Sequence, residues 1–505
     1  MPKQLLSFLI ESNLYLCAKT THALNYRRLF ILSAAIYLTT SIFSIGHHHP
    51  DEHFQILEFA ALKLGLAQEA DLAWEYHYQM RPALQPAFVV ALYRLLALFG
   101  RPNPFFVAFV LRLLSAALSL YVIHRMIRLY AARYRSDRIR RWFAVLSFLL
   151  WFTVYNNVRF SSENWSGSLF ALGFVMLLER AHPKLIRYLG AGALFGLAFV
   201  IRYQVAFMIL GLGLWLWWRR GDRFGRLVAM ALAFFAMVGT GILIDRWFYG
   251  DWVLTMWNYL KLNLIEGRAS GFGTSPWYYY VTETIKNAVP PFSLLYVAAF
   301  LWMFVKHPKS ALTWTVLPFV AVHSLIAHKE LRFMFPVLPF LPVAIAYLLD
   351  DLATRYGEAR FLSHPGFRFS RQLFWFANIV PLIGVMFLPA NPDVPRIRAL
   401  YRAIHKPAII YYSKLQPYGD FLPRKFYYPP YPVRLVPIET VRSIEPVPGH
   451  QIFIILNDDT QTDAYLRKGG RLIYNSYPRF TRKFNIGGWV DRIDWDTVVE
   501  LFPDD

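Results

Sequence analysis

Long apolar segments recur along the chain, and they constrain its fold more than any other feature. Eleven of them approach the roughly 20 residues that a helix needs to cross a bilayer. They fall at 29–46, 104–123, 143–158, 164–179, 188–201, 204–218, 227–247, 291–305, 310–327, 333–350 and 373–389. Only 17% of the 505 residues are charged, against roughly 25% in soluble domains. The sequence therefore predicts an all-α polytopic membrane protein with about eleven transmembrane helices.

The positive charge indicates membrane topology. A net charge of +21 is compatible with a nucleic-acid partner, but the cations form short clusters between the apolar segments. Cytoplasmic loops carry such clusters, and all of them fall on one side if 86–99 lies at the interface instead of crossing. We therefore expect a cytoplasmic N-terminus, an extracytoplasmic C-terminus and no nucleic-acid partner. The single cysteine, Cys17, excludes an intrachain disulfide.

This topology places two long loops, at about 47–103 and 248–290, and a tail outside the cytoplasm. We expect residues 1–390 to form the transmembrane domain, which includes these loops. Residues 391–505 are expected to form a small extracytoplasmic α/β domain.

Within the tail, eleven prolines between residues 391 and 450 indicate an extended segment without regular structure. Beyond them, QIFIIL at 451–456 and RLIYNS at 471–476 have the composition of strands. They flank a helix expected at 460–468, which two glycines would end.

Unusual polar residues collect on the outer side, most sharply in HHHPDEHFQ at 47–55. Pro50 would end the first helix and aim Asp51 and Glu52 in a defined direction. A carboxylate at the bilayer surface can act as general base for a sugar hydroxyl, with Asp51 as first choice and Glu52 as second. The histidines permit a metal site, but neighbours in a turn point apart, and we predict no metal. The alternative is that these polar groups are merely solvated.

HKELRF at 328–333 complements this acidic pair with cations. Lys329 and Arg332 precede an apolar helix and can grip a phosphate, for which Arg suits a bidentate contact. The alternative is an ordinary pair of cations that snorkel from a helix end. The predicted phosphate-binding residues are His328, Lys329, Arg332, Arg81 and Arg202.

Aromatic side chains in the outer loops can stack on sugar faces, although aromatic belts at membrane interfaces also account for them. Tyr279 and Tyr280 can stack on a sugar in the same way, together with Trp74, Trp277 and Tyr278. The residues predicted to bind the acceptor or its sugar are His49, Trp74, Glu75, Trp277 and Tyr278.

The motifs together resemble those of the lipid-linked mannosyltransferases, a family that includes GPI mannosyltransferases and the lumenal mannosyltransferases of asparagine-glycan assembly. HPDEHFQ, AWEYHYQMRP, the pair IDRWFYGDWV and NYLKLN, GFGTSPWYYY and HKELRFMFPVLPF occur in the family's order over roughly residues 30–345. The resemblance implies the GT-C fold, a polyprenyl-phosphate mannose donor and action on the non-cytoplasmic face without metal or other cofactor. This chain has Pro82 after Arg81, where the family usually has serine.

The resemblance also implies inversion, in which a β-linked lipid-phosphate mannose gives an α-mannoside in one displacement. A phosphate can leave without protonation by a carboxylic acid, unlike the leaving group in a glycosidase. Cations are needed instead, to stabilise its negative charge. The implied partners are the lipid donor, a glycan or glycolipid acceptor and membrane lipids.

Two alternatives to this function stay open. One is a transferase of another lipid-linked sugar, of the aminoarabinose or protein O-mannosyl type. The other is a non-enzymatic lipid carrier or flippase, which should place ionisable residues at mid-depth and on both faces. The expected location is a bacterial inner membrane, because N-x-S/T occurs only at Asn164, with the endoplasmic reticulum membrane as alternative.

Overall fold

The computed structural model describes residues 26–413, 416–419, 422–440, 443–456, 459–477 and 496–502, so Cys17 lies outside the described residues. By its internal contacts the chain divides into two compact units. The first unit consists of Met1–Phe43, Arg112–Gly241 and Leu260–Phe387, and the second of Ser44–Leu111, Ile242–Tyr259 and Leu388–Asp505. The division at residue 390 that the sequence predicts stays a prediction.

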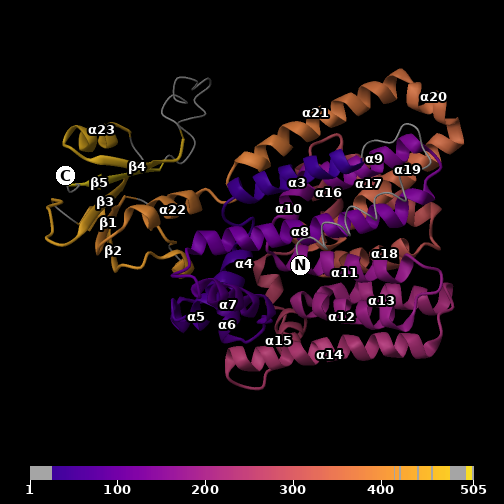
Figure 1. Ribbon diagram of the computed structural model, residues 1–505, viewed down its shortest axis with the longest axis horizontal. Helices are drawn as coiled ribbons and strands as arrows, with labels where there is room; N and C mark the ends of the chain where they lie inside the picture. The colour runs from indigo at the N-terminus through magenta and orange to yellow at the C-terminus, as the bar shows by residue number, and fades with distance from the viewer. Residues whose placement is uncertain are drawn as a thin grey trace. The chain divides into compact units, whose positions relative to one another are not determined.

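The first unit is built from helices (Figure 1). Its α-helices, some of which continue beyond the unit, are α3 (Tyr26–Phe43), α8 (Pro104–Tyr130), α9 (Asp137–Leu149), α10 (Trp151–Asn157), α11 (Ser162–Leu178), α12 (Leu185–Ile201), α13 (Ala206–Leu214), α14 (Phe224–Tyr249), α16 (Tyr279–Asn287), α17 (Ser293–Lys306), α18 (Ala311–Leu325), α19 (Leu341–Tyr356), α20 (Glu358–Ser363) and α21 (Pro365–Phe387). A 3-10 segment, η8 (Leu331–Phe340), leads into α19 and contains Pro336 and Pro339, which cannot donate helical hydrogen bonds.

Each of the eleven predicted apolar segments is mostly helical, but their number as membrane spans is not confirmed. Four helices of the described chain are long and apolar enough to cross a membrane, Pro104–Arg133, Phe224–Tyr249, Leu331–Tyr356 and Pro365–Phe387. Other apolar helices, such as Leu185–Ile201 and Ala311–Leu325, are shorter. The segment 143–158 splits at Leu150, whose backbone is extended.

Asn378 of α21 forms hydrogen bonds with the backbone groups on either side of this break. Its side chain accepts a hydrogen bond from the Trp151 N–H at 3.1 Å and donates one to the Leu149 carbonyl at 2.7 Å. A broken helix survives away from water only where another group satisfies the freed backbone atoms, as this amide does.

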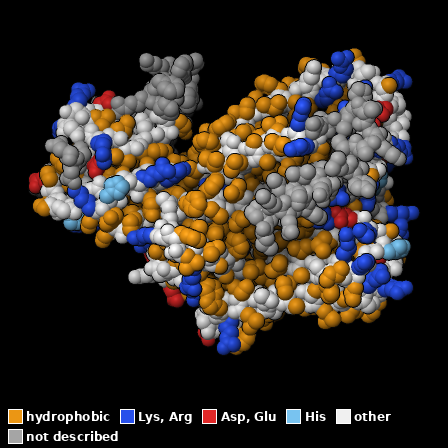
Figure 2. Space-filling view, in the orientation of Figure 1, with side chains coloured by type: hydrophobic (Ala, Val, Ile, Leu, Met, Phe, Trp, Pro, Cys, Tyr) orange, Lys and Arg blue, Asp and Glu red, His pale blue; other side chains and the backbone are white. Residues whose placement is uncertain are grey.

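Large apolar side chains remain exposed on the outer helices of the first unit, among them Leu232 and Phe235 on α14 and Phe376 and Ile383 on α21. Figure 2 shows hydrophobic side chains over much of the face in view. A surface of this kind is costly in water and suits contact with lipid. The observed surface therefore agrees with a membrane-embedded protein.

Small residues let the helices of the first unit approach closely. A Cβ atom added to Gly192 of α12 would lie 2.1 Å from the Met230 carbonyl oxygen of α14, and one added to Gly196 would lie 2.6 Å from that of Phe234. Such close backbone packing through glycine is typical of helices in membranes.

The second unit contains a five-stranded sheet with the strand order β2-β1-β3-β5-β4. Its strands are β1 (Ala408–Tyr412), β2 (Val433–Pro437), β3 (Gln451–Leu456), β4 (Arg471–Asn475) and β5 (Thr497–Leu501). Strands β2, β1 and β3 run parallel, whereas β5 is antiparallel to both β3 and β4. The predicted strands at 451–456 and 471–476 are confirmed as β3 and β4, and the predicted helix is α23 (Asp459–Arg467).

The expectation that residues 391–450 lack regular structure is wrong. This stretch contains helix α22 (Asp393–Ala403) and strands β1 and β2. The prolines lie at the ends of the elements, in the first turn of α22 or in the connections between elements, where a missing N–H costs little. Pro407 and Pro432 precede the two strands, and Pro437 ends β2. The proline count alone does not reveal this placement.

The second unit also holds the first loop and part of the second. Their helices are α4 (Pro50–Glu52), a π-helical turn η1 (His53–Leu57), α5 (Glu58–Lys63), α6 (Trp74–His77), α7 (Leu84–Ala97) and α15 (Thr255–Leu260). The stretch predicted as interfacial, 86–99, falls largely on α7.

Candidate active site

Asp51 lies in the short helix α4, with about a quarter of its side chain exposed. Pro50 begins this helix, and His49 caps it because its Nδ1 atom accepts the Asp51 N–H at 3.3 Å. That nitrogen therefore carries no proton toward the Asp51 carboxylate, which lies 3.4 Å away. His49 thus orients the backbone of Asp51, and its predicted contact with the acceptor stays a prediction.

Arg81 brings a positive charge close to Asp51 in the second unit. Its Nη2 atom lies 3.8 Å from Asp51 Oδ2 and 3.5 Å from Glu75 Oε1. Glu75 is buried and also accepts a hydrogen bond from Gln55 Nε2 at 3.0 Å. The structure thus joins the two motifs at 47–55 and 72–82 through one guanidinium, and the phosphate-binding role expected for Arg81 stays a prediction.

The second loop fixes the segment that carries Arg81. Tyr249 donates its hydroxyl to the Arg81 carbonyl at 2.7 Å, and Asn258 Nδ2 donates to the Gln79 carbonyl at 3.1 Å. The buried Asp245 accepts the Ala83 N–H at 2.7 Å. The IDRWFYGDWV and NYLKLN motifs therefore hold the backbone on both sides of Arg81.

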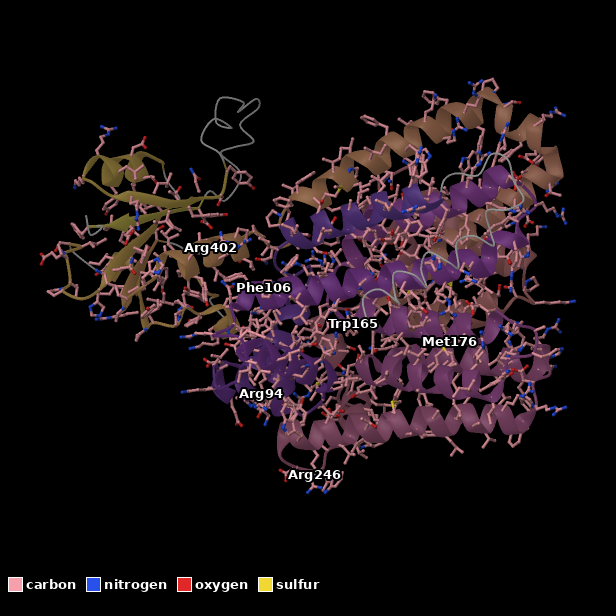
Figure 3. The ribbon with its side chains drawn as sticks, viewed as in Figure 1. Arg94, Phe106, Trp165, Met176, Arg246 and Arg402 are labelled. Carbon is pink, nitrogen blue, oxygen red and sulfur yellow. The ribbon has the colours of Figure 1, made fainter. Side chains whose placement is uncertain are left out.

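Asp245 and its neighbour Arg246 have opposite environments. Asp245 is buried and also accepts the Thr255 hydroxyl at 2.6 Å. Arg246 is exposed (Figure 3), and its guanidinium lies over the Trp252 ring at 4.2 Å. The aspartate thus holds the first loop from a buried position, whereas the arginine contacts the second loop at the surface.

His53 and Glu58 form a fully buried pair just after Asp51, with 2.7 Å between His53 Nε2 and Glu58 Oε1. Burial raises the pKa of Glu58 to about 8, although hydrogen bonds from the backbone of Phe426 and Lys425 oppose the shift. Burial, followed by the charge of Arg424, holds the pKa of His53 well below its usual value. Burial thus favours the neutral form of both side chains.

The raised pKa of Glu58 predicts a dependence of stability on pH. Unfolded Glu58 loses its proton near pH 4.5 and folded Glu58 near pH 8, so its contribution to stability falls as pH rises between these values. The expected fall is roughly 1.4 kcal/mol per pH unit relative to Glu58→Gln, in which His53 is unchanged. Thermal unfolding of both proteins in detergent at several pH values measures this difference. A difference that does not change with pH would contradict the assignment.

The first unit gathers a second cluster around Glu163, which is buried. Glu163 Oε1 lies 2.8 Å from Arg202 Nη1 and 3.2 Å from Arg332 Nη1. Both guanidinium groups also lie over the Phe333 ring, at 5.2 and 5.4 Å. Two of the predicted phosphate ligands, Arg202 and Arg332, are therefore brought together around one carboxylate.

The HKELRF motif packs around its own glutamate. Arg332 donates through Nε to Glu330 Oε2 at 2.6 Å, and His328 Nε2 lies 3.1 Å from Glu330 Oε1. Lys329 donates its ammonium to the carbonyls of Ser275 at 2.7 Å and Ile326 at 2.5 Å, and burial lowers its pKa. Lys329 therefore ties the GFGTSPWYYY motif to this cluster.

Donor atoms near Arg202 lack partners within the described chain. Arg202 is 6% exposed, yet its Nε and Nη2 atoms make no hydrogen bond to a described residue. The Tyr280 hydroxyl, in a side chain that is 5% exposed, makes none either. Burial raises the pKa of Tyr280, and the charge of Arg202 acts against that shift, so the two groups are close enough to interact. Buried polar groups are normally paired, so these donors suit a ligand that accepts hydrogen bonds.

The predicted sugar-stacking residues have different environments. Trp277 is 70% exposed and makes an edge contact with Tyr278, which is also exposed. Trp74 packs against Tyr78 at the start of α6, beside the buried Glu75. Neither arrangement tests an acceptor role, which stays a prediction for these residues. Glu52 accepts the His48 N–H at 3.2 Å, and its catalytic role also stays a prediction.

Sequence reasoning missed Glu163, Glu330, Tyr280, Asp245 and Glu58 as members of these clusters. The local sequence gave a signal for these residues, because each lies in or beside a stretch that combines carboxylates, cations and aromatic residues. The sequence does not show which residue each of them contacts. Asp245 bonds a residue 162 positions away, and Glu163 bonds one 169 positions away.

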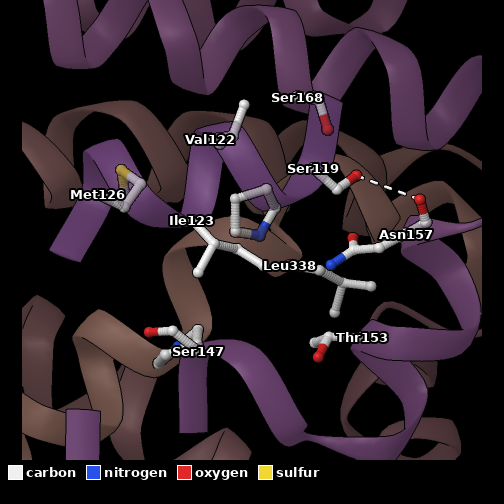
Figure 4. Close-up of a pocket in the computed structure, with 11 residues that line it drawn as sticks. Ser119, Val122, Ile123, Met126, Ser147, Thr153, Asn157, Ser168 and Leu338 are labelled. Atoms are coloured by element: carbon white, nitrogen blue, oxygen red, sulfur yellow. Dashed lines mark hydrogen bonds between the residues drawn. The ribbon is translucent and has the colours of Figure 1, made fainter. Parts of the chain in front are cut away.

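A pocket opens among the helices of the first unit (Figure 4). Leu338 and Pro339 of η8 line it together with Val122, Ile123 and Met126 of α8. Hydroxyl groups from four further residues lie on its walls, and Ser119 donates to the Asn157 carbonyl at 3.3 Å. The full lining is Ser119, Val122, Ile123, Met126, Ser147, Thr153, Asn157, Ser168, Leu338, Pro339 and Pro342. No predicted site residue contributes to this lining.

Comparison with known proteins identifies the family. Residues 28–405 match the model of the Alg9-like mannosyltransferase family. GPI alpha-1,2-mannosyltransferase 3 of Bos taurus is 28% identical over 60% of this chain and 56% of its own length. GPI mannosyltransferase 3 of Drosophila melanogaster is 24% identical over 70% of this chain and 60% of its own. The matched region thus spans little more than half the length of these relatives.

Solved structures agree on the fold. ArnT from Cupriavidus metallidurans in the apo state matches with a TM-score of 0.52 and 13% identity, over 95% of this chain and 99% of that one. The same protein bound to undecaprenyl phosphate matches with a TM-score of 0.51 and 12% identity, over 96% and 100%. At this identity the likeness shows the GT-C fold alone.

The helical fold, the clustered motifs and the family match together place this chain in one class of protein, the membrane-embedded glycosyltransferases. The chain belongs to the Alg9-like mannosyltransferase family, as its motifs predict. The relatives named above come from eukaryotes, so they do not support the bacterial inner membrane expected from the sequence.

Proposed function

We propose that this chain transfers mannose from a polyprenyl-phosphate donor to a glycan or glycolipid acceptor on the non-cytoplasmic face of a membrane. Membership of the Alg9-like mannosyltransferase family supports the sugar and the reaction type. The observation that carries the proposal is the partly exposed Asp51 carboxylate, which lies within the family-matched region with Arg81 as its cationic neighbour.

Asp51 is the proposed general base. A nearby guanidinium favours the charged carboxylate, which can then accept the proton of an acceptor hydroxyl as the new glycosidic bond forms. Glu75 shares Arg81 with Asp51, so we assign Glu75 the role of holding the guanidinium in place. Glu52 remains the second choice for the base.

Arg202, Arg332, Lys329 and Tyr280 are the proposed groups that receive the donor phosphate, with His328 beside them. Preorganised cations and hydroxyls stabilise the negative charge that develops on a departing phosphate. The unused donor atoms of Arg202 and Tyr280 support this role, because a phosphate oxygen satisfies them. A solved protein of the same fold, ArnT, binds undecaprenyl phosphate, which fits a polyprenyl donor here.

The acceptor proposed for this chain is a glycolipid. The relatives named above are a GPI alpha-1,2-mannosyltransferase and a GPI mannosyltransferase. Trp74 and Trp277 offer aromatic faces on which a sugar can stack, and His49 lies beside the base.

The full chain in lipid nanodiscs tests the proposal. With labelled polyprenyl-phosphate mannose and glycolipids of the GPI type, we expect the label to move to the acceptor. The matched control replaces the lipid donor with GDP-mannose, from which no transfer is expected. Transfer from GDP-mannose alone, or none from the lipid donor with any of these glycolipids, would refute the function.

A further inference from the structure

Asp51 belongs to a continuous helical run that contains an unusual turn. The run extends from Pro50 to Lys63, and its second part, His53–Leu57, is π-helical. The Glu58 N–H closes this turn on the His53 carbonyl, five residues earlier. Single π turns are rare and occur frequently at functional sites.

The side chains of His53 and Glu58, the two residues that this backbone hydrogen bond joins, also contact each other. His53 Nε2 and Glu58 Oε1 lie 2.7 Å apart, and both side chains are buried. The extra residue of a π turn brings positions five apart onto one face, which an α-helical turn does not. The buried pair and the π turn therefore support each other, only two residues after Asp51.

The same pair binds a segment of the tail that lies about 370 residues later in the chain. Both carboxyl oxygens of Glu58 accept the Phe426 N–H, at 3.1 and 3.3 Å. The His53 ring stacks on Tyr427 with 5.1 Å between ring centroids, and Tyr427 stacks in turn on Phe105 at 4.6 Å. We call His53, Glu58, Phe426 and Tyr427 the tail clasp.

The tail clasp has a higher free-energy cost than apolar residues would have if its role were packing alone. A buried carboxyl and imidazole lose hydration that only well-placed hydrogen bonds restore, and apolar residues of similar volume commonly pack at lower cost. The Phe426 N–H and the Tyr427 ring reach this pair only while the tail segment is in place. Because Asp51 and His53 share one short helical run, contacts that hold His53 also restrain the backbone that carries Asp51.

We propose that His53 and Glu58 are positioning residues, through which tail segment 424–427 orients Asp51 for the transfer reaction. This inference rests on the proposed function, since it concerns the base of that reaction. It gives residues beyond 390 a task in catalysis that is separate from substrate binding. Donor binding, which we assign to groups of the first unit, should not depend on it.

Kinetics of two Glu58 variants in the full chain test the inference. In Glu58→Ala, kcat for mannose transfer should fall about 10- to 100-fold, as expected when a catalytic group shifts by about 1 Å, while the KM for the lipid donor stays within about twofold. Glu58→Gln keeps an acceptor for the Phe426 N–H and a donor for His53, so its kcat should stay within about threefold of wild type. Glu69→Ala removes a carboxylate that accepts only the Tyr76 hydroxyl among its described contacts, and should leave kcat unchanged.

Hydrogen exchange separates positioning from general loss of structure. In Glu58→Ala, peptides that cover 50–57 and 424–428 should exchange faster together, whereas peptides of the first unit keep the wild-type rate. A wild-type kcat for Glu58→Ala, or faster exchange in the tail peptide alone, would overturn the inference. If wild type transfers no mannose, the proposed function fails, and the exchange measurement still decides whether the clasp holds the helical run.

Discussion

Replacing Asp51 with asparagine should lower kcat for mannose transfer by about 10²–10⁴-fold, the usual contribution of a general base. Asparagine keeps the size of the side chain and can still accept a hydrogen bond from Arg81, but it cannot take a proton from the acceptor. Binding of the lipid donor should change by less than about threefold, because we assign the phosphate to other groups. Single-turnover transfer in nanodiscs, with donor binding measured separately, provides both numbers.

Glu52→Gln is the matched control for this prediction, because it neutralises the neighbouring carboxylate in the same short helix. Its effect on kcat should be much smaller than that of Asp51→Asn. If Asp51→Asn turns over at nearly the wild-type rate while Glu52→Gln does not, Glu52 is the base. If both retain activity, the base lies elsewhere.

Replacing Arg202 with glutamine should weaken binding of the lipid donor about 10- to 150-fold. A charge-assisted hydrogen bond is worth roughly 1.5–3 kcal/mol, and Arg202 has two buried nitrogen atoms without a partner among the described residues. A titration of polyprenyl-phosphate mannose against the variant measures the loss. The KM for the acceptor should be nearly unchanged.

Two further variants show whether that loss reflects the ligand or the fold. Arg202→Lys preserves the charge beside Glu163 and should lose less affinity than Arg202→Gln. Tyr280→Phe removes only a hydroxyl that has no partner in the described chain, so it should weaken donor binding without lowering the thermal midpoint. A Tyr280→Phe protein with wild-type donor affinity would remove Tyr280 from the site, and an Arg202→Gln protein with wild-type affinity would move the phosphate elsewhere.

The sequence predicted the helical character and the motifs because both depend on local pattern. Apolar segments, clustered arginines and the HPDE and HKELRF runs are visible without any knowledge of contacts. The strands at 451–456 and 471–476 were predictable for the same reason. The same local reasoning does not detect breaks such as the one at Leu150, where Asn378 of a distant helix bonds the Trp151 N–H and the Leu149 carbonyl. The number of spans therefore stays a prediction.

Pairing between distant residues was beyond sequence reasoning. Glu163 lies in the polar stretch VRFSSEN at 158–164, yet nothing local indicates that it lies between Arg202 and Arg332. The π turn that sets Glu58 against His53 also leaves no clear signal, since a one-residue change in helical spacing is not visible in composition. The prediction for residues 391–450 failed for a different reason. A count of prolines ignores where each proline lies relative to the helices and strands.

The stereochemistry of the product tests the central claim most directly, because a single displacement by a base-activated hydroxyl must invert the anomeric centre. Wild-type chain in nanodiscs is supplied with β-linked polyprenyl-phosphate mannose labelled with ¹³C at the anomeric carbon. NMR of the purified glycolipid product then gives the configuration of the new linkage. The proposed mechanism predicts an α-mannoside. A β-mannoside would contradict it and would require a covalent intermediate or a different sequence of bond formation.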